Sequence, residues 1–243
     1  MSKKSLKSRT ILYGIILAAF AFMAVNIFVF YQREYASNPI IQQNISPFST
    51  RYVYDFYVSS TPNINGRSYY GSKNASITII AFMDIGSEPS KYFIREMFPQ
   101  IEHDYINAGE AKIYFKNYIT AQDFQDKTER FLYAQALSCV ESGKKESYYQ
   151  FYFDLFDTNG TKELKNLLDK NTISRDRFDA CINKQDYKNI LIDMSETENF
   201  GIVGITPRFY IGLDGRDNSV IEGVPAYTKF KRAIKEYQIT VGE

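Results

Sequence analysis

Residues Ile77–Phe93 read ITIIAFMDIGSEPSKYF, an apolar run that passes through a short polar turn into the start of a helix. Ile77–Phe82 is predicted as a buried strand, because β-branched and aromatic residues follow one another there without a charge. Ser87 is a favourable N-cap, and Pro89 is tolerated in a first helical turn. The helix is therefore predicted to run from Ser90 to about Ala108.

A second strand and a helical region follow. Ala111–Ile119 alternates apolar and polar residues, so the strand, helix and strand predict a right-handed βαβ unit with a parallel pair. Residues 120–199 change to short helical patterns, which indicate a helical insertion. Strand signals return at Arg208–Ile211 and Ser219–Ile221, and Tyr227–Tyr237 is predicted as the last helix. The fold class is therefore α/β.

The N-terminus contains the longest apolar stretch. Residues 11–31 carry no charge and are long enough as a helix to cross a hydrocarbon core of about 30 Å. Basic residues precede this stretch, so the positive-inside rule predicts that residues 1–10 are cytoplasmic and that the rest of the chain is extracytoplasmic. A cleaved signal peptide is the alternative, but its apolar region is shorter and ends in small residues. We expect a single-pass protein of the cell membrane, held by lipid through residues 11–31.

Composition excludes other classes of function. The chain has 29 basic and 28 acidic residues, and no basic stripe with interleaved aromatics stands out, which argues against nucleic-acid binding. Its 20 tyrosines and 19 phenylalanines are more typical of a core than of a cofactor site. No metal, cofactor or small-molecule ligand is expected.

Two segments resemble the DsbA-like branch of the thioredoxin superfamily. Gly71–Asp84 resembles the lead-in to the active site of that branch, which usually continues into Cys-x-x-Cys at the helix start. In register, those two cysteines fall on Ser87 and Ser90. Phe200–Ile211 resembles the family's Gly-x-x-Gly-x-x-Pro segment, whose proline is cis and faces the redox helix. The resemblance therefore implies that Pro207 is the cis-proline.

The resemblance implies a thioredoxin-like fold with a helical insertion domain, preceded by one transmembrane helix. The predicted segments are a cytoplasmic tail (1–10), a membrane anchor (11–31), an extracytoplasmic tether with an edge strand near Tyr52–Val58 (32–68), the first half of the thioredoxin fold (69–119), the helical insertion (120–199) and the second half of the fold (200–243).

Serine at positions 87 and 90 removes the dithiol chemistry of this family. A hydroxyl is not a thiolate at neutral pH, and two hydroxyls cannot form a disulfide. The single histidine, His103, lies sixteen residues beyond Ser87, about 24 Å along a helix, so it is too far to activate that hydroxyl. No catalytic residue is expected.

A binding role can survive the loss of the thiols. In the family, an extended peptide bonds to the backbone of the residue before the cis-proline, here Thr206, and such strand addition needs no sulfur. The resemblance therefore implies a peptide-binding groove formed by Ser87, Glu88, Ser90, Thr206 and Pro207.

The two cysteines of the chain are Cys139 and Cys181. Their spacing is not that of a dithiol catalyst or a zinc site, and an extracytoplasmic position favours a structural disulfide. A pair of free buried thiols is the alternative. Three sequons, at Asn44, Asn74 and Asn159, are possible glycosylation sites.

Together these features predict a membrane-anchored, redox-inactive DsbA-like protein. Its expected role is a chaperone-like or scaffold module that holds an extended polypeptide client or a membrane-protein partner. Two alternatives remain open: a thiol-disulfide oxidoreductase that acts through Cys139 and Cys181, and a structural subunit of a membrane complex.

Overall fold

The computed structural model describes residues 57–58, 61–141, 145–158, 160–213 and 218–241, all within one compact unit that begins at Val53. The predicted tail, the predicted membrane anchor and the sequons at Asn44 and Asn159 lie outside the described residues. Asn74 is described and is exposed. No helix among the described residues is both long enough and apolar enough to cross a membrane.

A mixed β-sheet forms the centre of this unit. Its described strands are β1 (Tyr57–Val58), β2 (Tyr70–Gly71), β3 (Ile77–Met83), β4 (Ala111–Asn117), β5 (Arg208–Leu213) and β6 (Asn218–Glu222), in the order β1-β6-β5-β3-β4-β2. β3 and β4 are parallel, as the βαβ prediction requires, whereas the other neighbouring strands are antiparallel. The short strand β2 was not predicted.

The helix after β3 is less regular than the sequence suggests. It consists of α2 (Glu88–Tyr92), a π-helical segment η1 (Phe93–Met97), α3 (Phe98–Ile101) and a second π-helical segment η2 (Glu102–Ile106). Pro99 has no backbone N–H and its ring crowds the carbonyl of the preceding turn, which accounts for the irregularity around η1. The backbone N–H of Phe98 accordingly bonds to the carbonyl of Phe93, five residues earlier.

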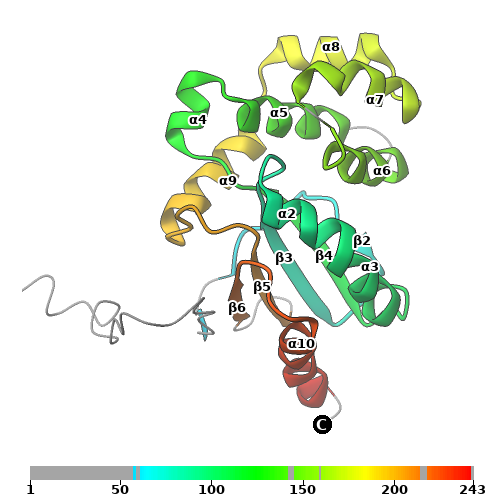
Figure 1. Ribbon diagram of the computed structural model, residues 1–243, viewed down its shortest axis with the longest axis vertical. Helices are drawn as coiled ribbons and strands as arrows, with labels where there is room; N and C mark the ends of the chain where they lie inside the picture. Colours follow the sequence, from blue (N-terminus) through cyan, green and yellow to red (C-terminus); the bar gives the residue numbers. More distant parts are fainter. Residues whose placement is uncertain (1–56, 59–60, 142–144, 159, 214–217, 242–243) are drawn as a thin grey trace, which may run out of the picture. The chain divides into compact units, whose positions relative to one another are not determined.

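The helical insertion lies between β4 and β5 in the chain. Its elements are α4 (Ala121–Asp126), α5 (Glu129–Glu141), α6 (Lys145–Leu155), η3 (Thr161–Glu163), α7 (Leu164–Lys170), α8 (Arg175–Lys184) and α9 (Lys188–Asn199), and α10 (Tyr227–Val241) follows β6. Figure 1 shows α4 to α8 gathered beyond one end of β3 and β4, with α2 and α3 across a face of the sheet. The short helix α4, which starts at a Thr120–Asp123 capping box, was not predicted.

Successive residues of β3 contribute to two different cores. Ile79 and Ala81 belong to the larger core, which also contains Phe93 of η1 and Phe230 of α10. Phe82 points to the smaller core on the opposite face of the sheet. All seven residues of β3 are buried, as expected for a central strand with both faces covered. This strand is therefore a rigid support for the turn that follows it.

A buried ion cluster joins the predicted tether to the sheet and the insertion. The Asp193 carboxylate of α9 accepts hydrogen bonds from the Arg67 guanidinium at 3.2 and 3.3 Å and forms an ion pair with the Lys116 ammonium at 3.1 Å. Glu141 of α5 lies 3.7 Å from the Arg67 guanidinium, and Glu196 pairs with Lys116. Residues 61–68 are thus packed on the domain through Arg67, whose distant partners show no pattern in the sequence.

Candidate functional site

The turn after β3 is built around the side chain of Ser87. Ser87 is the N-cap of α2, with φ −88° and ψ 137°, and its hydroxyl oxygen accepts a hydrogen bond from the backbone N–H of Ser90 at 3.3 Å. The two hydroxyl oxygens of Ser87 and Ser90 are 2.9 Å apart. The backbone N–H of Asp84 donates to the Ser90 hydroxyl at 3.3 Å. The hydrogen bonds of the two serine hydroxyls therefore connect the turn after β3 to the first turn of α2.

The loop before β5 brings Thr206 to the same place. The Thr206–Pro207 peptide bond is cis, and the Thr206 hydroxyl oxygen lies 3.3 Å from that of Ser87. These residues are 119 positions apart in the sequence. They meet because β3 and β5 are adjacent antiparallel strands, so that the end of β3 faces the start of β5. This is the juxtaposition that the family resemblance implied.

Arg130 of α5 ties the helical insertion to this turn. Its guanidinium donates to the Asp84 carboxylate at 2.8 Å and contacts the Asp123 carboxylate at 3.4 Å. Asp84 in turn accepts a hydrogen bond from the backbone N–H of Gly86 at 3.0 Å. Burial raises the pKa of Asp123, but hydrogen bonds from Thr120 and Thr128 and the charge of Arg130 outweigh burial, so the net shift lowers the pKa.

Tyr118 connects the same arginine to the loop before Pro207. The Arg130 guanidinium lies over the Tyr118 ring, 5.4 Å from its centroid, and the Tyr118 hydroxyl accepts a hydrogen bond from the backbone N–H of Gly204 at 3.1 Å. Arg130 therefore positions both the Ser87 turn and the Gly204 loop. Its ion pair with Asp84 spans 46 positions, and no local pattern in the sequence indicates it.

A cavity of about 370 Å³ opens beside Ser87. It is lined by carboxylates of Asp84, Asp123 and Glu129, by Arg130 and by Tyr133. The cavity lies where the parallel strands β3 and β4 end, which is the usual position for ligand sites in α/β sheets. No group of three or more His, Cys, Asp or Glu side chains that could hold a metal ion is found among the residues the structure describes.

The predicted groove residues differ strongly in exposure. Ser90 is fully buried and Thr206 is 6% exposed, so neither offers a side chain to a partner. Glu88 is exposed and pairs with Lys91 at 2.9 Å, while Ser87 is half-buried. The backbone N–H and C=O of Thr206 have no hydrogen-bond partner among the described residues. Strand addition uses unpaired backbone groups of this kind, although Thr206 as a whole residue is only 6% exposed.

Two apolar residues next to Thr206 were missed by sequence analysis. Val203 is 81% exposed and Ile205 is 51% exposed, although both are large and apolar. Exposed residues of this kind are informative when they lie beside a candidate site. The pattern Gly-Ile-Val-Gly-Ile-Thr-Pro could have drawn attention to them, because two glycines leave the apolar residues without a strand or helix to bury them.

Nucleophilic catalysis has no support at Ser87. His103 is on η2, is 87% exposed at its side chain and bonds to the neighbouring Asp104 at 2.9 Å. The nearest carboxylate in the turn, Asp84, is already occupied by Arg130. The hydroxyls can donate and accept hydrogen bonds, and the site holds no sulfur.

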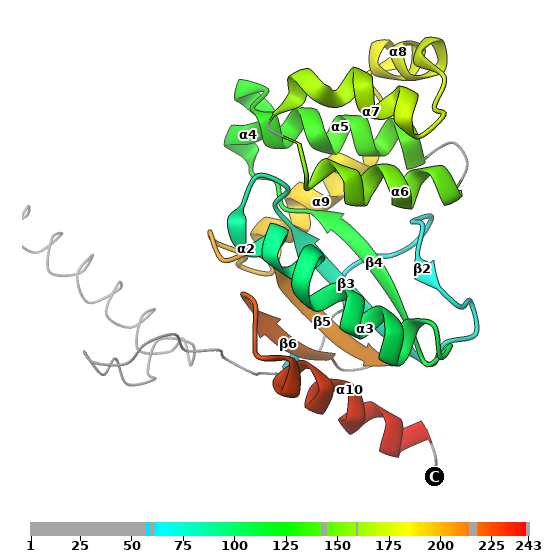
Figure 2. The same ribbon diagram turned by 45° about the vertical axis from the view of Figure 1, so that its right-hand side comes forward.

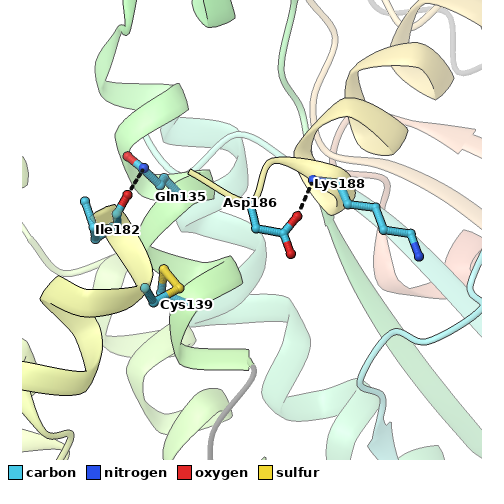
Figure 3. The surroundings of a disulfide bond; sticks show 6 residues. Gln135, Cys139, Ile182, Asp186 and Lys188 are labelled. Atoms are coloured by element: carbon cyan, nitrogen blue, oxygen red, sulfur yellow. Dashed lines mark hydrogen bonds between the residues drawn. A yellow bond between two sulfur atoms is a disulfide. The ribbon is translucent and has the colours of Figure 1, made fainter. Parts of the chain in front are cut away.

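The predicted disulfide between Cys139 and Cys181 is confirmed, and neither cysteine is free. It joins α5 to α8 within the helical insertion, as Figure 3 shows, and beside it the Gln135 side chain donates to the Ile182 carbonyl at 3.5 Å. The two cysteines are 42 positions apart in sequence. Neither lines the cavity beside Ser87. The disulfide therefore links two helices of the helical insertion covalently.

Removing this bridge is expected to destabilise the insertion. In the chain-entropy model, a loop of this length contributes about 4 kcal/mol to the free energy of unfolding. The variant Cys139→Ser with Cys181→Ser should therefore unfold at a clearly lower urea concentration than the wild type. Added dithiothreitol should lower the wild-type midpoint and leave the variant unchanged, which is the internal control. Equal midpoints for the oxidised wild type and the variant would contradict the structural role.

Comparisons with known proteins agree with this geometry. The family model described as thioredoxin matches residues 63–236. Disulfide bond formation protein D of Bacillus subtilis (strain 168) is 26% identical over 188 residues, which cover 74% of this chain and 80% of that protein.

Solved structures show the same fold at lower identity. The oxidised BdbD structure from Bacillus subtilis has a TM-score of 0.60 at 22% identity and covers 74% of this chain and 97% of that chain. DsbA from Chlamydia trachomatis has a TM-score of 0.56 at 20% identity and covers 72% of this chain and 93% of that chain.

The family match covers well over half of the chain. It includes the Ser87 turn, the loop with Thr206 and the whole helical insertion. The solved structures share the overall fold of this chain. The chain is thus a DsbA-like member of the thioredoxin superfamily.

Proposed function

We propose that this protein binds an extended segment of a polypeptide client or a membrane-protein partner beside Ser87 and Thr206, without thiol-disulfide exchange. The observation that carries the proposal is the unpaired backbone of Thr206, next to a cavity and two exposed apolar side chains. An extended segment can satisfy those backbone groups as an added strand. Val203 and Ile205 supply apolar contacts for its side chains.

The absence of sulfur supports binding without redox chemistry. The relative from Bacillus subtilis is named for disulfide bond formation, and that chemistry needs a reactive thiolate. This chain has serine at both positions, and its two cysteines are joined in the insertion. A module of this kind acts as a chaperone or scaffold rather than as an oxidoreductase.

Location at the membrane is part of the same proposal. Residues 11–31 would anchor the chain in the lipid bilayer, and the domain would lie on the extracytoplasmic side. The Cys139–Cys181 disulfide supports this placement, because structural disulfides persist in oxidising compartments. The anchor would keep the binding site close to clients that emerge from, or are embedded in, the membrane.

A substitution at Ile205 tests the groove. Ile205→Asp in the detergent-extracted full chain should weaken binding of a labelled, carboxymethylated unfolded protein about tenfold, because a charge replaces apolar contact area. Binding is measured by fluorescence anisotropy. The matched control is Leu191→Asp on α9, which introduces the same charge at another apolar residue, 43% exposed.

Two results would count against the groove. Equal weakening of binding in Ile205→Asp and Leu191→Asp would show that the unfolded protein binds to exposed apolar residues in general and not to this groove. Wild-type affinity in Ile205→Asp would show that the client does not contact this loop.

A further inference from the structure

A second and larger cavity is lined by residues of the edge strand β2 and of α3 and α6, among others. Figure 2 shows where these three elements lie. The cavity has a volume of about 650 Å³ and shares no lining residue with the cavity beside Ser87. Half of its lining residues are aromatic, and its polar side chains beyond the tyrosines are one carboxylate and one amide. The residues that matter here are Tyr70, Phe98, Glu102, Tyr149, Gln150 and Phe153.

The aromatic walls are fixed by contacts with one another. The Tyr70 ring lies 5.0 Å from the Tyr149 ring and 5.7 Å from the Phe153 ring, both edge to face, and 5.9 Å from the Phe98 ring. These distances are within the range of favourable aromatic pairs. Because the rings come from β2, α3 and α6, the packing of three elements holds the cavity open.

The carboxylate in this cavity has no cationic partner among the lining residues. Glu102 accepts a hydrogen bond from the Tyr70 hydroxyl, and the cavity is lined by no lysine or arginine. Burial, together with the hydrogen bond and charge of Glu102, raises the pKa of Tyr70 to about 12, so Tyr70 remains a neutral donor. The cavity therefore combines aromatic surface with one negative charge.

The edge of the sheet next to the cavity is open among the described residues. β2 is the last strand in the sheet order and pairs only with β4, through Tyr70 opposite Ile113 and Gly71 opposite Lys112. The outer side of such a strand presents unpaired backbone groups to another chain. A cavity of this volume also exceeds the size of a single side chain. Both features fit an extended polypeptide better than a small ion.

We infer that this cavity binds an extended polypeptide segment of a partner through one arginine or lysine side chain, whose cation lies among the aromatic rings and pairs with Glu102. A cation over aromatic faces is attracted by the ring quadrupoles, and a neighbouring carboxylate adds a charge-assisted hydrogen bond. The rest of the segment lies along the outer edge of β2. This site is separate from the groove at Thr206 and does not depend on the function proposed there.

A pair of isosteric peptides tests the inference. The probes are the labelled pentapeptide Ac-Thr-Val-Arg-Val-Thr-amide and the same peptide with citrulline, a neutral isostere, in place of arginine. Fluorescence anisotropy with the detergent-extracted full chain should show the arginine peptide binding about tenfold more tightly at low salt, with the difference reduced at high salt.

Two variants separate the contribution of charge from that of shape. Glu102→Gln keeps an acceptor for the Tyr70 hydroxyl and should lower the arginine-peptide affinity to that of the citrulline peptide. Phe153→Leu removes one ring and should weaken the arginine peptide several-fold. Leu191→Asp on α9, which lines neither cavity, should leave the affinity unchanged and is the matched control.

Three results would overturn the inference. Equal binding of the two peptides would show that no cation is recognised. Unchanged affinity in both Glu102→Gln and Phe153→Leu would place the peptide elsewhere. Displacement of the arginine peptide by an equal concentration of choline would assign the cavity to a quaternary ammonium group instead of a polypeptide.

Discussion

Replacing Ser87 and Ser90 together with cysteine is expected to raise the dithiol turnover of the protein from the background rate to a measurable one. The two hydroxyl oxygens are already 2.9 Å apart, so sulfur atoms at the same positions can reach each other. The first of them would accept a hydrogen bond from the backbone N–H of residue 90 at the start of a helix, which stabilises a thiolate. An insulin-reduction assay measures the gain, from the background rate in the wild type to measurable turnover in the variant.

The single variants Ser87→Cys and Ser90→Cys are the matched controls, because one thiol cannot close an internal disulfide. Cys139→Ser combined with Cys181→Ser, added to the double cysteine variant, should leave the new turnover in place. Wild-type turnover that disappears in Cys139→Ser would contradict the binding proposal and favour an oxidoreductase that uses the existing cysteines. A double variant that forms its disulfide but stays inert would show that the cis-proline side of the site does not receive a substrate.

Asp193→Ala is expected to cause the largest loss of stability. The Asp193 side chain is fully buried, and its carboxylate contacts the Arg67 guanidinium, the Lys116 ammonium and both the backbone and side-chain N–H groups of Asn117. Alanine would remove one carboxylate partner from the buried Arg67 guanidinium and from the buried Lys116 ammonium. Breaking a buried pair in this way costs about 3–5 kcal/mol. The measurement is the free energy of unfolding from urea denaturation of the purified full chain.

Asp157→Ala is the matched control for this prediction. Asp157 also forms an ion pair, with Arg95 at 2.8 Å, but both side chains are largely exposed, and such pairs contribute about 0–1 kcal/mol. A loss in Asp193→Ala no larger than the loss in Asp157→Ala would show that the cluster does not hold residues 61–68, the sheet and the insertion together.

Local patterns in the sequence were sufficient for the central elements. The apolar run that became β3, the N-cap at Ser87 and the alternation in β4 each depend on neighbouring residues. The same holds for the βαβ order, whose parallel pairing follows from chain connectivity. The two π-helical segments were not foreseen, because the widening of the helix depends on how Pro99 and the buried side chains pack.

The family resemblance predicted which residues form the candidate site, but it could not give the exposure of each residue. Ser90 looked like a groove residue in the sequence, and the structure buries it fully under the turn. Ile205 looked like an ordinary apolar residue, and the structure leaves half of it exposed. Exposure depends on every element that packs against a residue, so a linear pattern cannot supply it.

The sequence alone therefore determined that a strand, a turn and a helix follow one another here, because these elements depend on residues within one short stretch. That serine stands where this family usually has its reactive cysteines is what the family resemblance implies. Only the tertiary structure decided what surrounds that stretch. The contacts of Arg130 with Asp84, of Thr206 with Ser87 and of Asp193 with Arg67 span 46, 119 and 126 positions of sequence. The aromatic cavity at β2 is lined by residues of β2, η1, α3, η2 and α6. Such contacts form only when the whole chain packs, since ion pairs and cavities have no local period that a sequence could display.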